Sequence, residues 1–157
     1  MAMLALTGER CVAQELVAWR GDPTPAIVLE DYYGKPINIE SFRGKTVLIN
    51  FWATWCGPCV EEMPSLQKFK TRFDTRKFEV LAVNVGESKA RVEAFLRKMA
   101  VDFPIAMDPQ SETAREWKVR GYPTTFIVGP DGKIRYYHVG DLDWGNEAIV
   151  NQVKGIR

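Results

Sequence analysis

The chain has 157 residues, enough for one domain with a sizeable core. Its 21 lysines and arginines and 20 aspartates and glutamates give a net charge of +1 and are scattered along the sequence, which argues against a nucleic-acid partner or an anionic-membrane patch. No apolar run reaches the ~18 residues of a membrane span, and residues 1–11 have neither the basic start nor the apolar stretch of a signal peptide.

The first part of the chain is predicted to be an N-terminal extension over residues 1–22, with the folded domain over 23–157. Within the extension, Val12, Leu16 and Trp19 follow the i, i+4, i+7 spacing of a short amphipathic helix. We expect this helix to dock on the main domain.

The rest of the chain changes regularly between strand and helix patterns. Residues 26–29 and 36–39 flank a turn and predict a hairpin. The predicted elements that follow are strands at 46–52, 79–85 and 103–107, helices at 59–73, 88–99 and 111–117, a hairpin of 124–128 and 134–139, and a last helix at 146–155. The alternation indicates an α/β fold with a parallel core covered by helices, and the last hairpin makes the sheet mixed.

The most informative motif is Trp55-Cys56-Gly57-Pro58-Cys59, at the turn from strand 46–52 into the next helix. Two thiols three residues apart at the start of a helix lie within bonding reach, which indicates a dithiol that closes and reopens as a disulfide. Three cysteines are too few for a disulfide framework. We interpret the third, Cys11, as a free thiol in the extension rather than a link to a partner.

Each position of the motif has a chemical interpretation. Cys56 opens the helix, where unpaired N–H groups favour a thiolate, so its pKa is expected below the free value of about 8.5 and it is the predicted nucleophile. Cys59 is the predicted resolving thiol, which attacks the mixed disulfide formed by Cys56. Pro58 is tolerated in the first helical turn, and Gly57 lets a substrate backbone come close. The alternatives are a metal pair, which would supply only two of four usual ligands, or two buried structural cysteines, and we expect no metal.

Glu62 and Asn50 each allow two interpretations, and a third polar residue, His138, allows one. Glu62 shares a helical face with Cys59; if that face is buried, its pKa would be raised and it would exchange a proton with Cys59, whereas spacing alone favours a solvated surface glutamate. Asn50, in the apolar strand, is as readily a core amide as a catalytic group. His138, the only histidine, is expected to face solvent.

Two segments resemble a known family. Residues 50–64 resemble the active-site signature of thioredoxin-fold proteins and, more narrowly, of the TlpA/ResA/DsbE (CcmG) group of bacterial thiol-disulfide oxidoreductases. Residues 119–125 resemble the second thioredoxin signature, whose proline is cis. The resemblance runs from about Thr24 to the C-terminus, and residues 87–107 resemble the inserted helix and strand of the TlpA-like branch.

The resemblance implies a thioredoxin fold: a mixed central sheet with helices on both faces, an N-terminal β-hairpin and the inserted helix–strand. It implies that Glu62 supplies the acidic function of the site. It also implies that Tyr122 and a cis Pro123 face the cysteines and bind an extended client through backbone groups. Trp55 is expected to cover the disulfide and, with Gly57 and Pro58, to line the same groove.

The function expected from these features is a thiol-disulfide oxidoreductase. The Gly57-Pro58 dipeptide holds no cation to stabilise the Cys56 thiolate, which favours a reductant. The resemblance implies protein clients of the cytochrome c biogenesis or copper-site assembly type and a membrane electron donor of the DsbD or CcdA kind. We expect no cofactor and a monomer.

The resemblance also bears on the cellular location of the protein. The resemblance implies a periplasmic or other extracytoplasmic protein, membrane-anchored in its native form if Met1 is only an expression start, and a cytosolic one if Met1 is genuine. The alternative function is a copper chaperone or redox-regulatory binding module that uses the same cysteine pair. A peroxiredoxin is disfavoured because Ala53 stands where the peroxidatic motif needs a threonine.

Overall fold

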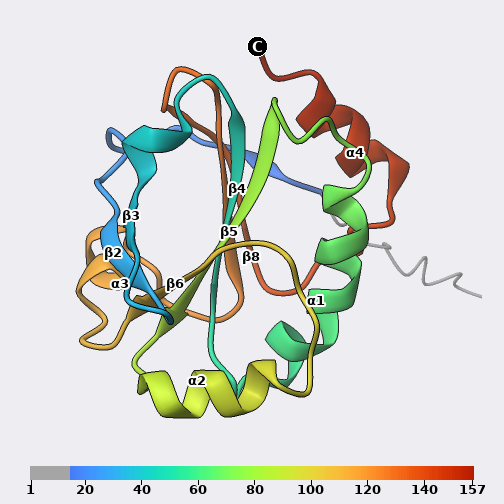
Figure 1. The fold of residues 1–157 in the computed structure, drawn as a ribbon. Helices are drawn as coiled ribbons and strands as arrows, with labels where there is room; N and C mark the ends of the chain where they lie inside the picture. The colour runs from blue at the N-terminus through green and yellow to red at the C-terminus, as the bar shows by residue number, and fades with distance from the viewer. Residues whose placement is uncertain (1–14) are drawn as a thin grey trace, which may run out of the picture.

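The computed structural model describes residues 15–157, which form one eight-stranded sheet with helices on both faces (Figure 1). The strands are β1 (Val17–Ala18), β2 (Val28–Asp31), β3 (Pro36–Asn38), β4 (Thr46–Trp52), β5 (Phe78–Val85), β6 (Ile105–Asp108), β7 (Thr124–Val128) and β8 (Ile134–Val139). The helices are the 3-10 helix η1 (Ile39–Phe42), α1 (Gly57–Lys70), α2 (Lys89–Leu96), α3 (Glu112–Glu116) and α4 (Glu147–Lys154).

The sheet is mixed, as its sequence pattern predicted. Its strand order is β1-β8-β7-β4-β5-β6-β2-β3, with β4, β5 and β6 parallel and the remaining neighbours antiparallel. Strand β4 lies at the centre, and all seven of its residues are buried. A strand covered on both faces needs an unbroken apolar run, and β4 departs from one only at Thr46 and Asn50.

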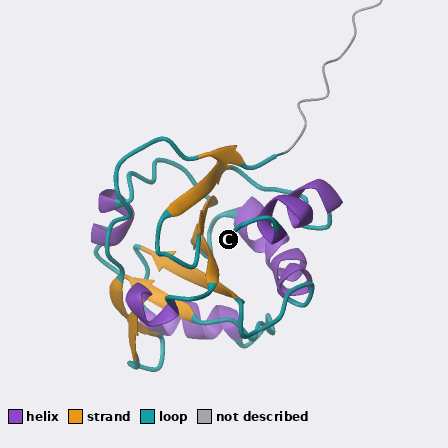
Figure 2. Ribbon diagram, turned by 90° about the horizontal axis from the view of Figure 1, so that it is seen from above, coloured by secondary structure: helices purple, strands orange, loops and turns teal. Residues whose placement is uncertain are grey.

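The two faces of the sheet have separate cores because alternate side chains of a strand point to opposite sides. From β4, Leu48 and Trp52 pack with buried residues of α1, α2 and α4, while Ile49 and Phe51 pack on the other face with those of α3. Figure 2 shows helices on either side of the strands. Asn50 belongs to the same face as Leu48 and Trp52, so its side chain is directed toward α1.

The N-terminal hairpin and the inserted helix–strand are both present, and they meet. Strand β2 pairs with β3, as the hairpin predicts, and also with β6 of the insertion, antiparallel to it. The hairpin thus extends the sheet beyond the insertion. Among residues 15–157, none of the helices combines the length and apolar character needed to cross a membrane.

The predicted amphipathic helix of the extension is wrong over residues 16–19. Leu16 is buried, but Val17 and Ala18 form β1, which pairs with Tyr137 and Tyr136 of β8. A helix and an edge strand can bury the same apolar residues. Here the free edge of β8 supplies hydrogen-bonding partners for the backbone of β1, which favours the strand. Val12 and Cys11 lie outside the described residues, and the domain division at residue 22 stays a prediction.

Candidate active site

The two cysteines lie where the central strand passes into a helix. Strand β4 ends at Trp52, and α1 begins at Gly57 with Cys56 as its N-cap residue. The backbone of Cys56 is extended (φ −86°, ψ 103°), and its Sγ accepts a hydrogen bond from the Cys59 N–H at 3.3 Å. Cys56 and Cys59 form a disulfide with their Cα atoms 5.3 Å apart. The first turn of α1 therefore brings the two sulfurs within bonding distance, as their spacing predicted.

The disulfide is shielded, whereas the residues between its cysteines are open. Cys56 is 4% exposed and Cys59 is fully buried. Gly57 and Pro58 are both exposed. A Cβ atom added at Gly57 would meet no atom of residues 15–157 within 4 Å, apart from its own helix backbone and chain neighbours. Among residues 15–157, the side of the turn that Gly57 faces is therefore open.

An apolar rim lies beside the disulfide. Trp55 is 63% exposed, and its ring meets the Tyr122 ring edge-on with centroids 5.8 Å apart. The Tyr122–Pro123 peptide bond is cis, as the resemblance implied, and the Pro123 carbonyl accepts a hydrogen bond from Gly140 N–H at 2.8 Å. Val139, also exposed, ends the strand beside this loop. The second sequence signature is thus brought next to the first by the ring contact of Trp55 and Tyr122.

Glu62 is a buried carboxylate, 5% exposed and one helical turn after Cys59. Its Oε1 accepts from Asn50 Nδ2 at 2.8 Å. Its Oε2 accepts from Trp144 Nε1 at 3.1 Å and from the Leu142 N–H at 3.3 Å. Burial raises the pKa of Glu62 to about 7, and these three donors hold it lower than burial alone would. The solvated-surface interpretation of Glu62 is therefore wrong.

Asn50 is a hydrogen-bonded core amide that contacts the candidate acid. Besides Glu62, its Nδ2 donates to Thr125 Oγ1 at 3.1 Å, across the pairing of β4 with β7. Its Oδ1 has no hydrogen-bond partner among residues 15–157. Asn50 is thus a core amide, and it also contributes to the candidate site because it positions the Glu62 carboxylate.

Sequence reasoning missed Leu142 and Trp144, which bind Glu62 from the segment between β8 and α4. They lie 80 and 82 residues from Glu62 in the chain. Nothing in the local pattern pairs an indole with a distant carboxylate. Only the packing of α4 and its preceding segment against α1 brings them together.

A second buried carboxylate, Glu87, was also missed. It accepts from the Thr54 N–H at 2.8 Å, the Thr54 hydroxyl at 2.5 Å and Asn84 Nδ2 at 2.7 Å, and pairs with Arg91 Nε at 3.0 Å. Glu87 follows β5, and the carboxyl ends of the parallel strands β4 and β5 lie at one edge of the sheet. That rule was available from the sequence and would have placed Glu87 beside the segment that leads to Cys56.

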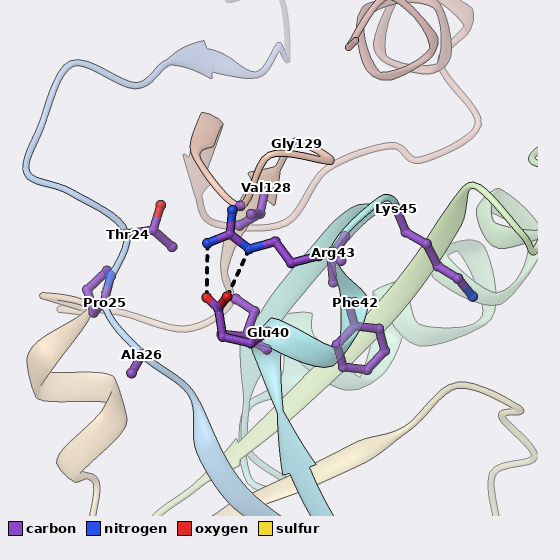
Figure 3. A pocket seen from close by; sticks show the side chains of 12 residues that line it. Thr24, Pro25, Ala26, Glu40, Phe42, Arg43, Lys45, Val128 and Gly129 are labelled. Atoms are coloured by element: carbon purple, nitrogen blue, oxygen red, sulfur yellow. Dashed lines mark hydrogen bonds and ion pairs between the residues drawn. The ribbon is translucent and has the colours of Figure 1, made fainter.

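The remaining features are His138 and a cavity. His138, on β8, is half-buried, and its Nδ1 lies 3.2 Å from the Glu15 carbonyl oxygen. A cavity of about 150 Å³ lies at the opposite end of β4 (Figure 3). Arg43 lines this cavity and is held by Glu40 through Nε–Oε2 and Nη2–Oε1 contacts of 3.0 and 3.1 Å. Since the cysteines follow the carboxyl end of β4, the cavity is separate from the candidate active site.

Comparison with known proteins gives matches over most of the chain. The Redoxin family matches residues 20–154. The chain is 40% identical over 114 residues to the thiol-disulfide oxidoreductase ResA of Bacillus subtilis, a match that covers 73% of this chain and 64% of that protein. It is 38% identical over 137 residues to ResA of Geobacillus thermodenitrificans, covering 87% of this chain and 78% of the relative.

Solved structures give the same picture. A Chlorobium tepidum structure described as a thiol:disulfide interchange protein of the DsbE type superposes with a TM-score of 0.79 and 31% identity. The superposition covers 87% of this chain and 96% of that one. The thioredoxin-like fold implied by the two sequence signatures is thereby confirmed.

Proposed function

The chain belongs to the Redoxin family and, within it, to the ResA-like thiol-disulfide oxidoreductases, and we propose that it reduces protein disulfides outside the cytoplasm through Cys56 and Cys59. The observation that carries this proposal is the arrangement of the pair. A disulfide spans the first turn of α1, and a buried carboxylate with a pKa of about 7 follows one turn later. Helix start, dithiol and acid together supply a nucleophile, a resolving thiol and a proton acceptor.

The reaction begins from the reduced dithiol. The Cys56 thiolate attacks one sulfur of a client disulfide, so a Cys56–client bond forms, the client S–S bond breaks, and one client thiolate leaves and takes a proton. Cys59 then gives its proton to Glu62 and attacks the Cys56 sulfur. The Cys56–Cys59 disulfide forms, the second client thiolate leaves, and two electrons have passed from the enzyme to the client.

The rim beside the disulfide supports a client bound as an extended chain. Trp55 and Tyr122 would cover apolar side chains of the client, and the open surface above Gly57 and Pro58 would admit its backbone. Backbone groups of Tyr122, next to the cis Pro123, would pair with the client main chain. Main-chain pairing makes little demand on client sequence, which suits an enzyme that selects cysteines.

The thiolate environment supports a direction of electron flow from this protein to its clients. Gly57 and Pro58 provide no positive side chain, and a less stabilised thiolate gives a more reducing dithiol. A reductant that works among oxidised proteins needs its own supply of electrons. We propose a membrane thiol donor of the DsbD or CcdA kind, and clients of the cytochrome c biogenesis or copper-site assembly type.

The equilibrium reduction potential of the Cys56/Cys59 pair tests this proposal. It is measured in defined thiol buffers by tryptophan fluorescence, with Cys56→Ser as the blank. We expect a value near or below that of thioredoxin, about −270 mV. A value near that of DsbA, about −120 mV, would make the protein an oxidant and overturn the proposed direction.

A further inference from the structure

Trp144 is the one aromatic side chain with a hydrogen bond to the candidate acid among residues 15–157, and the proposed mechanism gives it no part. It lies between β8 and α4, outside regular structure, and is 1% exposed. Its ring packs edge-on against Phe69 of α1 with centroids 5.0 Å apart. Packing fixes the ring, and the ring's Nε1–H is then directed at Glu62 Oε2, at 3.1 Å.

The indole and the neighbouring backbone bind the same oxygen. Leu142 N–H also donates to Glu62 Oε2, at 3.3 Å, so one short segment supplies two of the three donors to this carboxylate. A neutral indole is a donor only. It therefore stabilises the ionised carboxylate, and it cannot accept a hydrogen bond from a proton on the same oxygen of the neutral acid.

The same segment also touches the loop that faces clients. Gly140, two residues before Leu142, donates its N–H to the Pro123 carbonyl at 2.8 Å. The segment from Gly140 to Trp144 thus contacts both the cis-proline loop and Glu62. Its position is determined from both sides, which holds the indole in place.

We propose that Trp144 is a positioning residue of the active site: its indole N–H holds ionised Glu62 one helical turn from Cys59 and so sets the pH at which Cys59 is activated. This inference rests on the proposed function, because it assigns the proton of Cys59 to Glu62. Trp144 affects Cys59 only through Glu62, and the proposal includes no contact between Trp144 and a client.

Other groups around Glu62 also raise or lower its pKa. From β4, Asn50 donates and lowers the pKa of Glu62, whereas Asp141, in the segment before Leu142, raises it by repulsion. Thr125 of β7 is neutral and binds Asn50. On α1, Cys59 lies one turn before Glu62 and does not titrate while joined to Cys56 as a disulfide, and the adjacent Glu61 is exposed to solvent. The oxidised protein therefore isolates the titration of Glu62.

The test compares two buried tryptophans with similar packing. Trp144→Phe keeps an aromatic ring against Phe69 and removes the indole N–H together with part of the ring volume, a loss of volume that the control shares. The matched control is Trp117→Phe, because Trp117 is 2% exposed, meets Phe126 edge-on at 5.0 Å and donates to the Ala26 carbonyl on the other face of the sheet. The side-chain carboxyl carbon of Glu62 is titrated by NMR in each oxidised protein.

We expect the midpoint of Glu62 near pH 7 in the unsubstituted protein and in Trp117→Phe. In Trp144→Phe it should rise by about one pH unit, since a hydrogen bond to a charged group is lost. The pH profile of thiol exchange should move upward by the same amount. Equal midpoints in all three proteins would overturn the role of Trp144.

A second measurement needs no substitution, in case Trp144→Phe does not fold. In the oxidised protein, the indole N–H resonance of Trp144 should shift with pH at the midpoint of Glu62, while that of Trp117 stays constant. A Trp144 resonance unchanged between pH 5 and 9 would overturn the proposal. These titrations involve no client, so their failure would leave the proposed function standing, whereas an oxidising reduction potential would remove the function without affecting them.

Discussion

At the scale of single residues, the surroundings of Glu62 determine how stability depends on pH. Its pKa is about 7 in the folded protein and near 4.5 in an unfolded chain. Between these values the folded form holds a proton that the unfolded form has lost, so stability is full below pH 4.5 and falls as the pH rises through 7. Most of this loss develops between pH 4.5 and 7, and relative to low pH it amounts to about 3 kcal/mol once the pH exceeds 7.

Glu62→Gln should remove this loss. The glutamine carbonyl still accepts from Trp144 and Leu142, but nothing ionises. We expect the oxidised variant to keep its unfolding free energy from pH 5 to 8, where the parent declines by about 1 to 3 kcal/mol. Urea denaturation at several pH values measures this. Glu61→Gln, at the exposed neighbouring position, should decline like the parent, and a parallel decline in Glu62→Gln would contradict the assignment.

The same substitution tests proton transfer. With no carboxylate to accept the Cys59 proton, Glu62→Gln should slow thiol exchange by about 10²-fold and flatten its dependence on pH between 5 and 9. Stopped-flow kinetics with a disulfide-containing client measure both effects. Glu61→Gln again serves as the control. Unchanged rates in Glu62→Gln would return the residue to a structural role.

The order of attack is also a property of single residues. Cys56 retains a little exposed surface and Cys59 has none, so we expect a client to reach only the first sulfur. Cys59→Ser should therefore accumulate a mixed disulfide between Cys56 and the client, visible on non-reducing gels and by mass spectrometry. Cys56→Ser should accumulate none. The reverse pattern would exchange the two roles.

At the scale of elements, Glu87 holds the segment before Cys56 in place. Its carboxylate binds both the N–H and the hydroxyl of Thr54, and Asn84 from β5. Glu87→Ala would leave the Thr54 N–H and the Asn84 amide without this partner, so we expect a loss of about 2 to 4 kcal/mol in urea denaturation. Glu93→Ala, at an exposed position on α2, should change stability by less than about 0.5 kcal/mol. Similar losses in both variants would show that Glu87 anchors nothing.

The elements also show what a sequence of this kind can predict. Strands β4, β7 and β8 follow their predicted ranges, because buried apolar runs and turn residues set their limits. Helix α1, predicted at 59–73 and found at Gly57–Lys70, begins two residues and ends three residues earlier than predicted, whereas α3 and α4 differ by one residue at each end. Helix ends depend on capping, here by Cys56 itself, which a periodic pattern does not record.

Contacts between elements that are distant in the chain were harder to predict from the sequence. The resemblance supplied Glu62 and the cis Pro123, but the partners of Glu62 depend on how α4 and its preceding segment pack on α1. β1 was predicted as a helix because burial of Leu16 fits either structure. The missing information in both cases is the pairing of segments more than 80 residues apart.

At the scale of the whole molecule, we expect the protein to be a monomer. The exposed large apolar side chains of residues 15–157 are Val17, Val28, Tyr33, Trp55 and Val139, of which Trp55 and Val139 belong to the rim beside the disulfide. The sheet edges are short, since β1 has two residues and β3 begins with a proline that lacks an N–H. We expect one sedimenting species of monomer mass at all concentrations up to about 100 μM, the upper micromolar range in which exposed edges and apolar patches cause association. A dimer would contradict this.

The shielding of the disulfide has a consequence for the partners that can react with it. An exchange partner must approach a sulfur in line with the bond it breaks, and only 4% of Cys56 is open. Partners that dock on the rim of Trp55 and Tyr122 would be held beside this sulfur, whereas small thiols reach it only by chance collision. We therefore expect the oxidised protein to react faster with docked protein thiols than with small thiols, which still bring it to equilibrium, but slowly.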